Sequence, residues 1–170
     1  DEDYLASRMA DFDPEKVTPS DTVYAGDFNL PEHFETTHTS VVDPYGNAAS
    51  VTTTLNLNYG SKVIVEGAGF LLNDEMDDFS AKPGTPNFFG LLGTEANAVV
   101  GGKRPLSSMT PTIVLENGDV KAIIGSPGGS TIITTVLQMV LNVTTHNMGV
   151  EEAVAAPRFH HQWKPDRIVL

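Results

Sequence analysis

The chain has 170 residues, 40% of them hydrophobic, and a formal net charge of −12 at pH 7. That length is enough for one domain with a core. No apolar run approaches the roughly 20 residues of a membrane-spanning helix, and the acidic charge argues against a nucleic-acid-binding protein. Since cysteine is absent, disulfides and thiolate metal sites are excluded.

The first 35 residues differ from the rest in charge. They carry ten acidic and two basic residues, a net charge of −8, whereas the remaining 135 residues carry only −4. A short helix is predicted over residues 4–11, and Pro14, Pro19 and Pro31 then favour an extended or looping segment. This asymmetry predicts two parts with different roles, residues 1–35 and residues 36–170.

Residues 36–55 have the pattern of a β-hairpin. The segment from Thr36 to Val42 alternates as a strand does, Asp43-Pro44-Tyr45-Gly46-Asn47 is typical of a turn, and residues 48–55 return as a β-branched strand. We therefore expect the two ends of this segment, at Thr36 and near Thr54, to lie close together.

Thr36 is the best candidate for a nucleophile. A threonine hydroxyl reacts poorly unless a base removes its proton, and a free N-terminal amine on the same residue can be that base. Because an amide nitrogen is not basic, the site would lack its base while the bond from Glu35 to Thr36 is intact. Taken by itself, the pair Thr36-Thr37 favours ordinary strand residues, since β-branched residues prefer strands; only the pattern downstream favours a nucleophile. Thr54 on the return strand could face it, with Thr52 and Thr53 as alternatives.

An acidic turn follows at residues 73–80. Glu75 and Asp78 are three residues apart, close enough for two carboxylates to converge on one cation. A solvated turn or a loose calcium site is the alternative, although the Asp-x-Asp-x-Asp-Gly pattern is absent. Residues 80–104 contain five glycines and two prolines; this predicts a long loop of the kind that is functional or disordered.

The segment after this loop has two short polar motifs. Lys103-Arg104 resembles ordinary surface charge, and Ser107-Ser108 would be unremarkable alone. Residues 111–124 then predict a second hairpin around Glu116-Asn117-Gly118-Asp119. Helices are predicted over residues 131–141, with Ile132, Val136, Met139 and Val140 on one face, and over residues 150–155.

The run Gly125-Ser126-Pro127-Gly128-Gly129-Ser130 connects the second hairpin to the first of these helices. Glycines let backbone N–H groups approach a substrate closely, and a helix N-terminus offers unpaired donors and partial positive charge. The turn is therefore suited to an oxyanion hole, with a plain strand-to-helix turn as the alternative. No Lys-Ser or Lys-Thr follows, so a Walker loop is not supported.

The histidines show no pattern of metal ligands. Adjacent His160 and His161 would point apart on a strand, and no partner histidine has ligand spacing. His38 lies on the opposite strand face from Thr37, and nothing requires it as a base. Asn142-Val143-Thr144 fits a glycosylation sequon. We expect structural histidines and no metal site.

Four segments of the chain, in their order and spacing, resemble the small subunit of γ-glutamyltranspeptidases, enzymes that cut their own chain to expose a threonine. These segments are the strand that begins at Thr36, the acidic turn, Lys103 to Met109 and the glycine-rich turn. The resemblance extends from about Thr36 to Trp163. It implies an α+β fold, the N-terminal-nucleophile hydrolase four-layer αββα sandwich, present here in part. Residues 1–35 would be the C-terminal tail of the large subunit, and residues 36–170 a small-subunit catalytic domain truncated at its C-terminus.

The resemblance also implies a role for each site residue. The nucleophile would be Thr36, freed by cleavage between Glu35 and Thr36, with Thr54 as its hydrogen-bond partner and Gly128 and Gly129 as oxyanion donors. The substrate α-ammonium would be bound by Asn56, Glu75 and Asp78, and the α-carboxylate by Ser107 and Ser108. Phe89 falls where many family members have an aromatic residue covering the pocket.

The implied function is autocatalytic cleavage, followed by γ-glutamyl transfer and hydrolysis on glutathione and related compounds through a threonyl ester, with no metal or organic cofactor. The implied partners are that substrate, an acceptor amino acid or water, and the remainder of the large subunit. A related acylase, a poly-γ-glutamate hydrolase or an inactive unprocessed fragment are the alternatives. The family implies a periplasmic or extracellular location, although Asp1-Glu2-Asp3 is not typical of a signal peptide.

Overall fold

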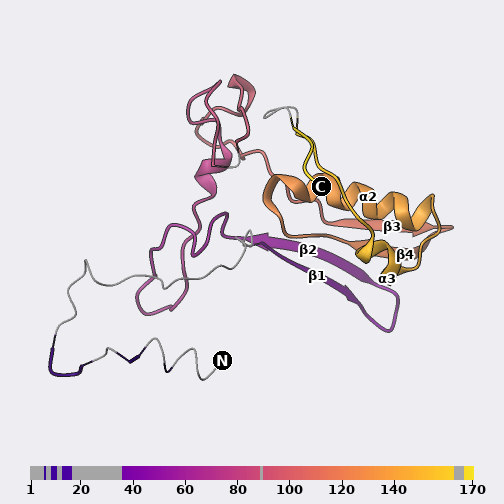
Figure 1. The fold of residues 1–170 in the computed structure, drawn as a ribbon, viewed down its shortest axis with the longest axis horizontal. Helices are drawn as coiled ribbons and strands as arrows, with labels where there is room; N and C mark the ends of the chain where they lie inside the picture. Colours follow the sequence, from indigo (N-terminus) through magenta and orange to yellow (C-terminus); the bar gives the residue numbers. More distant parts are fainter. Residues whose placement is uncertain (1–5, 7–8, 11–12, 17–35, 89, 163–166) are drawn as a thin grey trace. The chain divides into compact units, whose positions relative to one another are not determined.

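The computed structural model describes residues 6, 9–10, 13–16, 36–88, 90–162 and 167–170. The chain divides into two compact units, Asp1–His33 and Phe34–Leu170; the strands and longer helices that the structure describes belong to the second (Figure 1). The helix predicted over residues 4–11 falls largely outside the described residues, as do Glu35 and Phe89. The predicted boundary between residues 35 and 36 stays a prediction.

The first predicted hairpin is confirmed. Strand β1 (Thr36–Val42) pairs antiparallel with β2 (Ala48–Thr54), and Thr36 lies opposite Thr54. Asp43 fixes the turn, because its Oδ1 accepts hydrogen bonds from the backbone N–H groups of Tyr45 and Asn47 at 2.9 and 2.8 Å. Hydrogen bonds from Asn47 also lower the pKa of Asp43. This turn sets the hairpin register.

The second hairpin and both helices are also confirmed. Strand β3 (Thr112–Glu116) pairs with β4 (Asp119–Ile124), and helices α2 (Ile132–Thr144) and α3 (Val150–Ala155) follow. The apolar face predicted for α2 packs where expected: Ile132, which is 1% exposed, and Val136 form a buried cluster with Ile124 of β4. This cluster is the core that holds the glycine-rich turn between β4 and α2.

Each hairpin forms its own two-stranded sheet, and hydroxyl groups connect the two. Ser40 Oγ donates to the carbonyl of Ile123 at 3.3 Å, and Ser50 Oγ donates to the carbonyl of Ile124 at 3.5 Å. The first hairpin therefore lies along β4, as Figure 1 shows. As a consequence, the Thr36 end of β1 approaches the turn that follows Ile124.

The chain between the hairpins is mostly irregular, as predicted for residues 80–104. It contains two short 3-10 helices, η2 (Glu75–Asp78) and η3 (Glu95–Asn97), and a few isolated bridges such as that between Ser80 and Ala98. Across the described ranges, no helix is both long and apolar enough to cross a membrane.

Candidate active site

The hairpin register places two threonine hydroxyls together. Thr36 Oγ1 donates to Thr54 Oγ1 at 3.1 Å, and both side chains are half-buried. The competing candidates are separated from Thr36: Thr53 pairs with Thr37 on the exposed face, and Thr52 bonds to the ring of His38. Thr54 is therefore the residue that contacts the predicted nucleophile.

Asn56 joins this hairpin to the acidic turn. It is buried, adopts a left-handed conformation with φ of 75°, and donates its backbone N–H to Thr54 Oγ1 at 3.0 Å. Its side-chain Nδ2 donates to the carbonyl of Asp74 at 3.3 Å, and Asp74 Oδ1 in turn accepts the N–H of Leu57 at 3.1 Å. Asparagine tolerates the left-handed region better than other non-glycine residues, which explains its presence at this bend.

The two predicted acids meet in η2. Both are half-buried, and their carboxyl groups hydrogen-bond to each other. Burial, the bond to Asp78 and the charges of Asp78 and Asp74 raise the pKa of Glu75 to about 7. Burial, then the charges of Asp77 and Asp74, also raise the pKa of Asp78, against the lowering effect of its bond to Glu75. The pair therefore shares a proton near neutral pH, and a bound cation would replace that proton.

The glycine-rich turn depends on backbone conformations that glycine adopts readily. Gly128 and Gly129 have φ values of 131° and 56°. A Cβ on Gly128 would lie 2.5 Å from Thr131 Oγ1, and that hydroxyl donates to the Gly128 carbonyl at 2.8 Å. The short helix η4 (Gly129–Thr131) then leads into α2. The turn is thus tight, and it leads directly into α2, whose first residue, Ile132, is buried in the core.

One pocket brings together nearly all of the predicted site residues. Its lining includes the two threonines, Asn56, both acids of η2, both predicted serines and one of the two glycines: Thr36, Thr54, Asn56, Glu75, Asp78, Ser107, Ser108 and Gly129. Gly128 is not among the lining residues and directly precedes Gly129. The pocket is also lined by Leu91, Met109, Ser130 and Ile132, to which no site role was predicted. Met109, Ser130 and Ile132 lie within three residues of a predicted site residue, and this proximity is the signal that could have identified them.

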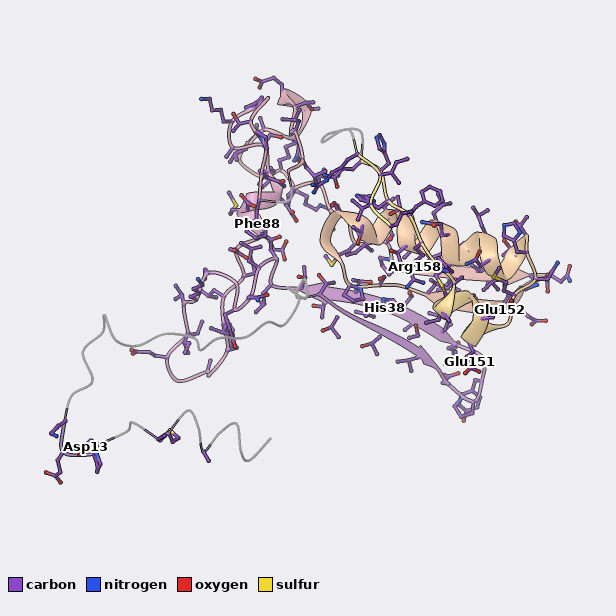
Figure 2. All side chains as sticks on the ribbon, viewed as in Figure 1. Asp13, His38, Phe88, Glu151, Glu152 and Arg158 are labelled. Carbon is purple, nitrogen blue, oxygen red and sulfur yellow. The ribbon has the colours of Figure 1, made fainter. Side chains whose placement is uncertain are left out.

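His38 and His160 lie outside this pocket and have structural contacts. The side chain of His38, labelled in Figure 2, comes from the first hairpin. Its ring bonds to Thr52 and Ser40 at 2.8 and 3.1 Å and packs against Gly125, where a Cβ would lie 2.0 Å from Nδ1. The His160 ring bonds to Thr134 of α2 at 2.8 Å. Within the described part of the chain, no group of three or more histidine and acidic residues could hold a metal ion.

A network of side chains connects His160 to the rim of the pocket. His160 Nε2 and Ser130 Oγ both bond to Gln162 Oε1, at 2.8 and 2.7 Å. Ser130 follows Gly129 and lines the pocket. The segment after α3 is therefore tied to the turn that was predicted to stabilise an oxyanion.

Comparison with known proteins gives consistent matches along the chain. The sequence model described as Gamma-glutamyltranspeptidase matches residues 1–170. The glutathione hydrolase proenzyme of Escherichia coli strain K12 is 53% identical over 165 residues, an alignment that covers 97% of this chain and 28% of the relative. The chain thus spans little more than a quarter of that relative's length.

Solved structures resemble the fold as well as the sequence. A crystal structure of an acivicin-inhibited γ-glutamyltranspeptidase, whose C-terminus has critical roles in autoprocessing and catalysis, aligns with a TM-score of 0.75 and 63% identity, over 78% of this chain and 70% of that one. The transpeptidase CapD of Bacillus anthracis aligns with a TM-score of 0.54 and 25% identity, over 75% of this chain and 62% of CapD.

Proposed function

The chain belongs to the γ-glutamyltranspeptidase family, and on this premise we propose that it carries the catalytic centre of an enzyme that hydrolyses and transfers γ-glutamyl groups. The observation that carries the proposal is the one pocket lined by the two threonines, the acid pair and the serines. The chain spans 28% of its Escherichia coli relative, so the activity is proposed for the full-length gene product.

Thr36 would first act on its own chain. Its hydroxyl adds to the carbonyl carbon of Glu35 and the peptide nitrogen leaves as an amine, which gives an ester between Glu35 and Thr36 Oγ1. Water then hydrolyses the ester, which leaves a carboxylate on Glu35 and a free amine and hydroxyl on Thr36. An α-amine titrates at about 7.7–8.0, so this step creates the base that the nucleophile needs.

The freed Thr36 would then attack the γ-amide of glutathione or a related compound. Its amine takes the hydroxyl proton, Oγ1 bonds to the γ-carbonyl carbon, and the backbone N–H groups of Gly128 and Gly129 stabilise the oxyanion. The bond from Thr36 Oγ1 to Thr54 supports a role for Thr54 in holding the nucleophile in one orientation. The amine of the substrate leaves with a proton, and water or an acceptor amino acid takes the γ-glutamyl group from the ester.

Both charged ends of the γ-glutamyl group would be bound by the loop side of the pocket. The Glu75–Asp78 pair, with Asn56, receives the α-ammonium, because a cation between two close carboxylates offsets the burial and the repulsion between acids that raise the pKa of each. Ser107 and Ser108 donate to the α-carboxylate. This combination of an acid pair with paired hydroxyls supports a glutamyl donor over the substrates of a related acylase or poly-γ-glutamate hydrolase.

The mixed α/β arrangement of strands and helices agrees with the similar solved structures. The finer architecture that we propose is the four-layer αββα sandwich, with residues 1–35 as the end of a large subunit and residues 36–170 as the small-subunit domain. The remainder of the large subunit would be the partner of this domain. A periplasmic or extracellular location is part of the same proposal.

Trapping the covalent intermediate tests this function. The full-length gene product is mixed with a γ-glutamyl anilide, quenched in acid and digested. We expect a peptide beginning at Thr36 to carry one γ-glutamyl group and to lose it in mild base. If the anilide is turned over and the group is found on another residue, Thr36 is not the nucleophile; without turnover, the proposed activity is wrong.

A further inference from the structure

Asn97, the last residue of η3, uses all of its polar groups to connect separate parts of the loop region. Its backbone N–H donates to the carbonyl of Thr94 at 3.0 Å, and its carbonyl accepts the N–H of Ser80 at 2.9 Å. Its side-chain Nδ2 donates to the carbonyl of Asp78 at 2.7 Å, and its Oδ1 accepts the N–H of Leu106 at 3.0 Å. The residue is half-buried; its bond to Asp78 is partly shielded from water, whereas its bond to Leu106 lies at the surface.

The two bonds of the side chain reach opposite ends of the proposed donor site. Asp78 belongs to the acid pair assigned to the α-ammonium, and Leu106 directly precedes Ser107 and Ser108, assigned to the α-carboxylate. Asn97 itself does not line that pocket; it lines a neighbouring cavity together with Asp78 and Ser108. It can therefore influence the site only through the backbone of the two segments.

The position of Asn97 is fixed from both sides. Lys103 Nζ donates to the carbonyls of Ala96 and Ala98, the neighbours of Asn97 in the chain. Ser80 and Ala98 form a parallel bridge. Because the backbone of Asn97 is fixed, a substitution of its side chain should alter the positions of the segments to which that side chain bonds.

We propose that Asn97 is a positioning residue that sets the separation between the ammonium-binding and carboxylate-binding ends of the donor site; this rests on the proposed function. The α-ammonium and α-carboxylate of a γ-glutamyl group are attached to one carbon, so both are bound well only at one spacing. A primary amide presents a donor and an acceptor side by side without charge. Aspartate of the same size lacks the donor when ionised, and alanine lacks both groups.

The test compares donors that carry one or both charged groups. The full-length gene product is assayed with γ-glutamyl, glutaryl and γ-aminobutyryl anilides; the second lacks the α-ammonium and the third lacks the α-carboxylate. We expect Asn97→Ala to raise the KM of the γ-glutamyl donor about tenfold, as for two neutral hydrogen bonds lost. The preference, which is the kcat/KM of the γ-glutamyl donor divided by that of each analogue, should fall by about the same factor. The kcat for the γ-glutamyl donor and the cleavage before Thr36 should change less than about threefold.

The matched control is Asn47→Ala. Asn47 Nδ2 also donates to an oxygen, Asp43 Oδ2 at 2.7 Å, but in the turn of the first hairpin. This variant should keep the wild-type preference. Asn97→Asp retains the side-chain size and the acceptor for Leu106 and should lose part of the preference.

The outcomes separate this inference from the function on which it rests. A wild-type enzyme without preference for the γ-glutamyl donor would contradict the proposed function. If wild type has the preference and Asn97→Ala keeps it, or loses kcat equally with all three donors, Asn97 only supports the fold and the inference is wrong. Should Asn97→Ala not fold, an unchanged preference in Asn97→Asp overturns it in the same way.

Discussion

The two sides of the candidate site are built in different ways. On the nucleophile side, regular antiparallel pairing brings Thr36 opposite Thr54, and one turn fixes that register. On the ligand side, the regular structure described within residues 73–88 and 90–108 consists of short 3-10 helices and isolated bridges, and side-chain-to-backbone bonds hold Asp78 and Leu106 in place. In a paired strand, many backbone hydrogen bonds together fix the position of a residue. In the loop, the positions of Asp78 and Leu106 depend on a few side-chain amide bonds.

This difference predicts that the two sides can be disabled separately. The nucleophile side should suffice for the cleavage of the chain before Thr36, which needs no bound amino acid. The ligand side should matter only for the turnover of donors. Substitutions therefore sort into those that affect both reactions and those that affect turnover alone.

The largest expected effect of this kind comes from Asp78→Ala. It removes a half-buried acid that we assign to the substrate ammonium, and the loss of one partner of such a charge pair costs about 2–5 kcal/mol, roughly thirtyfold to several thousandfold in kcat/KM. Cleavage before Thr36 should continue. Mass spectrometry and anilide turnover measure the two reactions, with Asp119→Ala in the second hairpin turn as the control. Unchanged turnover would remove Asp78 from the ammonium site.

Gly128→Ala should slow both reactions, because both pass through an oxyanion. The added Cβ would lie 2.5 Å from Thr131 Oγ1 at a φ of 131°, which forces the turn to shift. The loss of one oxyanion donor costs about 10²–10³ in kcat. Gly118→Ala is the matched control: its φ is 95° with open space around it, so it should cost only stability. A Gly128→Ala enzyme with wild-type kcat would exclude the turn as the oxyanion site.

Thr54→Ala should affect cleavage and turnover by similar, smaller factors. It removes the acceptor for Thr36 Oγ1, and a neutral hydrogen bond contributes about 0.5–1.5 kcal/mol, roughly threefold to tenfold in each rate. The control is Thr53→Ala, one residue away on the exposed face of the same strand. Equal rates in the two variants would show that the hydroxyl pair does not orient the nucleophile.

The last expected effect is a change of pH dependence in Glu75→Gln, which is the smallest of the four at and above pH 7. With a pKa raised to about 7, Glu75 becomes protonated below that pH and loses attraction for the donor ammonium as the pH falls. The kcat/KM of wild type relative to Glu75→Gln should therefore fall below pH 7, by about tenfold per unit at most. The Thr36 amine titrates in both enzymes and cancels in the ratio. A ratio that stays constant between pH 6 and 8 would show that Glu75 does not titrate there.

The sequence was most informative where local patterns determine the structure. Alternation and turn residues predicted both hairpins, and helical spacing predicted the face of α2 that contains Ile132 and Val136. The glycines at 128 and 129 were expected to form a special turn, and both adopt positive φ. The convergence of Glu75 and Asp78 follows from their spacing of three within one turn.

What remained open depends on contacts between distant residues. The choice among Thr52, Thr53 and Thr54 required the register, which the bonds of Asp43 determine. Asn97 lies in a segment that is rich in glycine and proline and shows no hydrophobic periodicity. No sequence pattern near it predicts its bonds to Asp78 and Leu106. The family resemblance implied which residues share the pocket; elementary patterns alone did not.

The central claim is that Thr36 becomes a catalyst only when its own amine is freed. The intact mass of the full-length gene product, with and without Thr36→Ala, tests it most directly. We predict that wild type separates into two chains, the second beginning at Thr36, that donor turnover appears in step with this separation, and that Thr36→Ala stays whole and inactive. A wild-type protein that turns over γ-glutamyl donors while the bond between Glu35 and Thr36 remains intact would contradict the account.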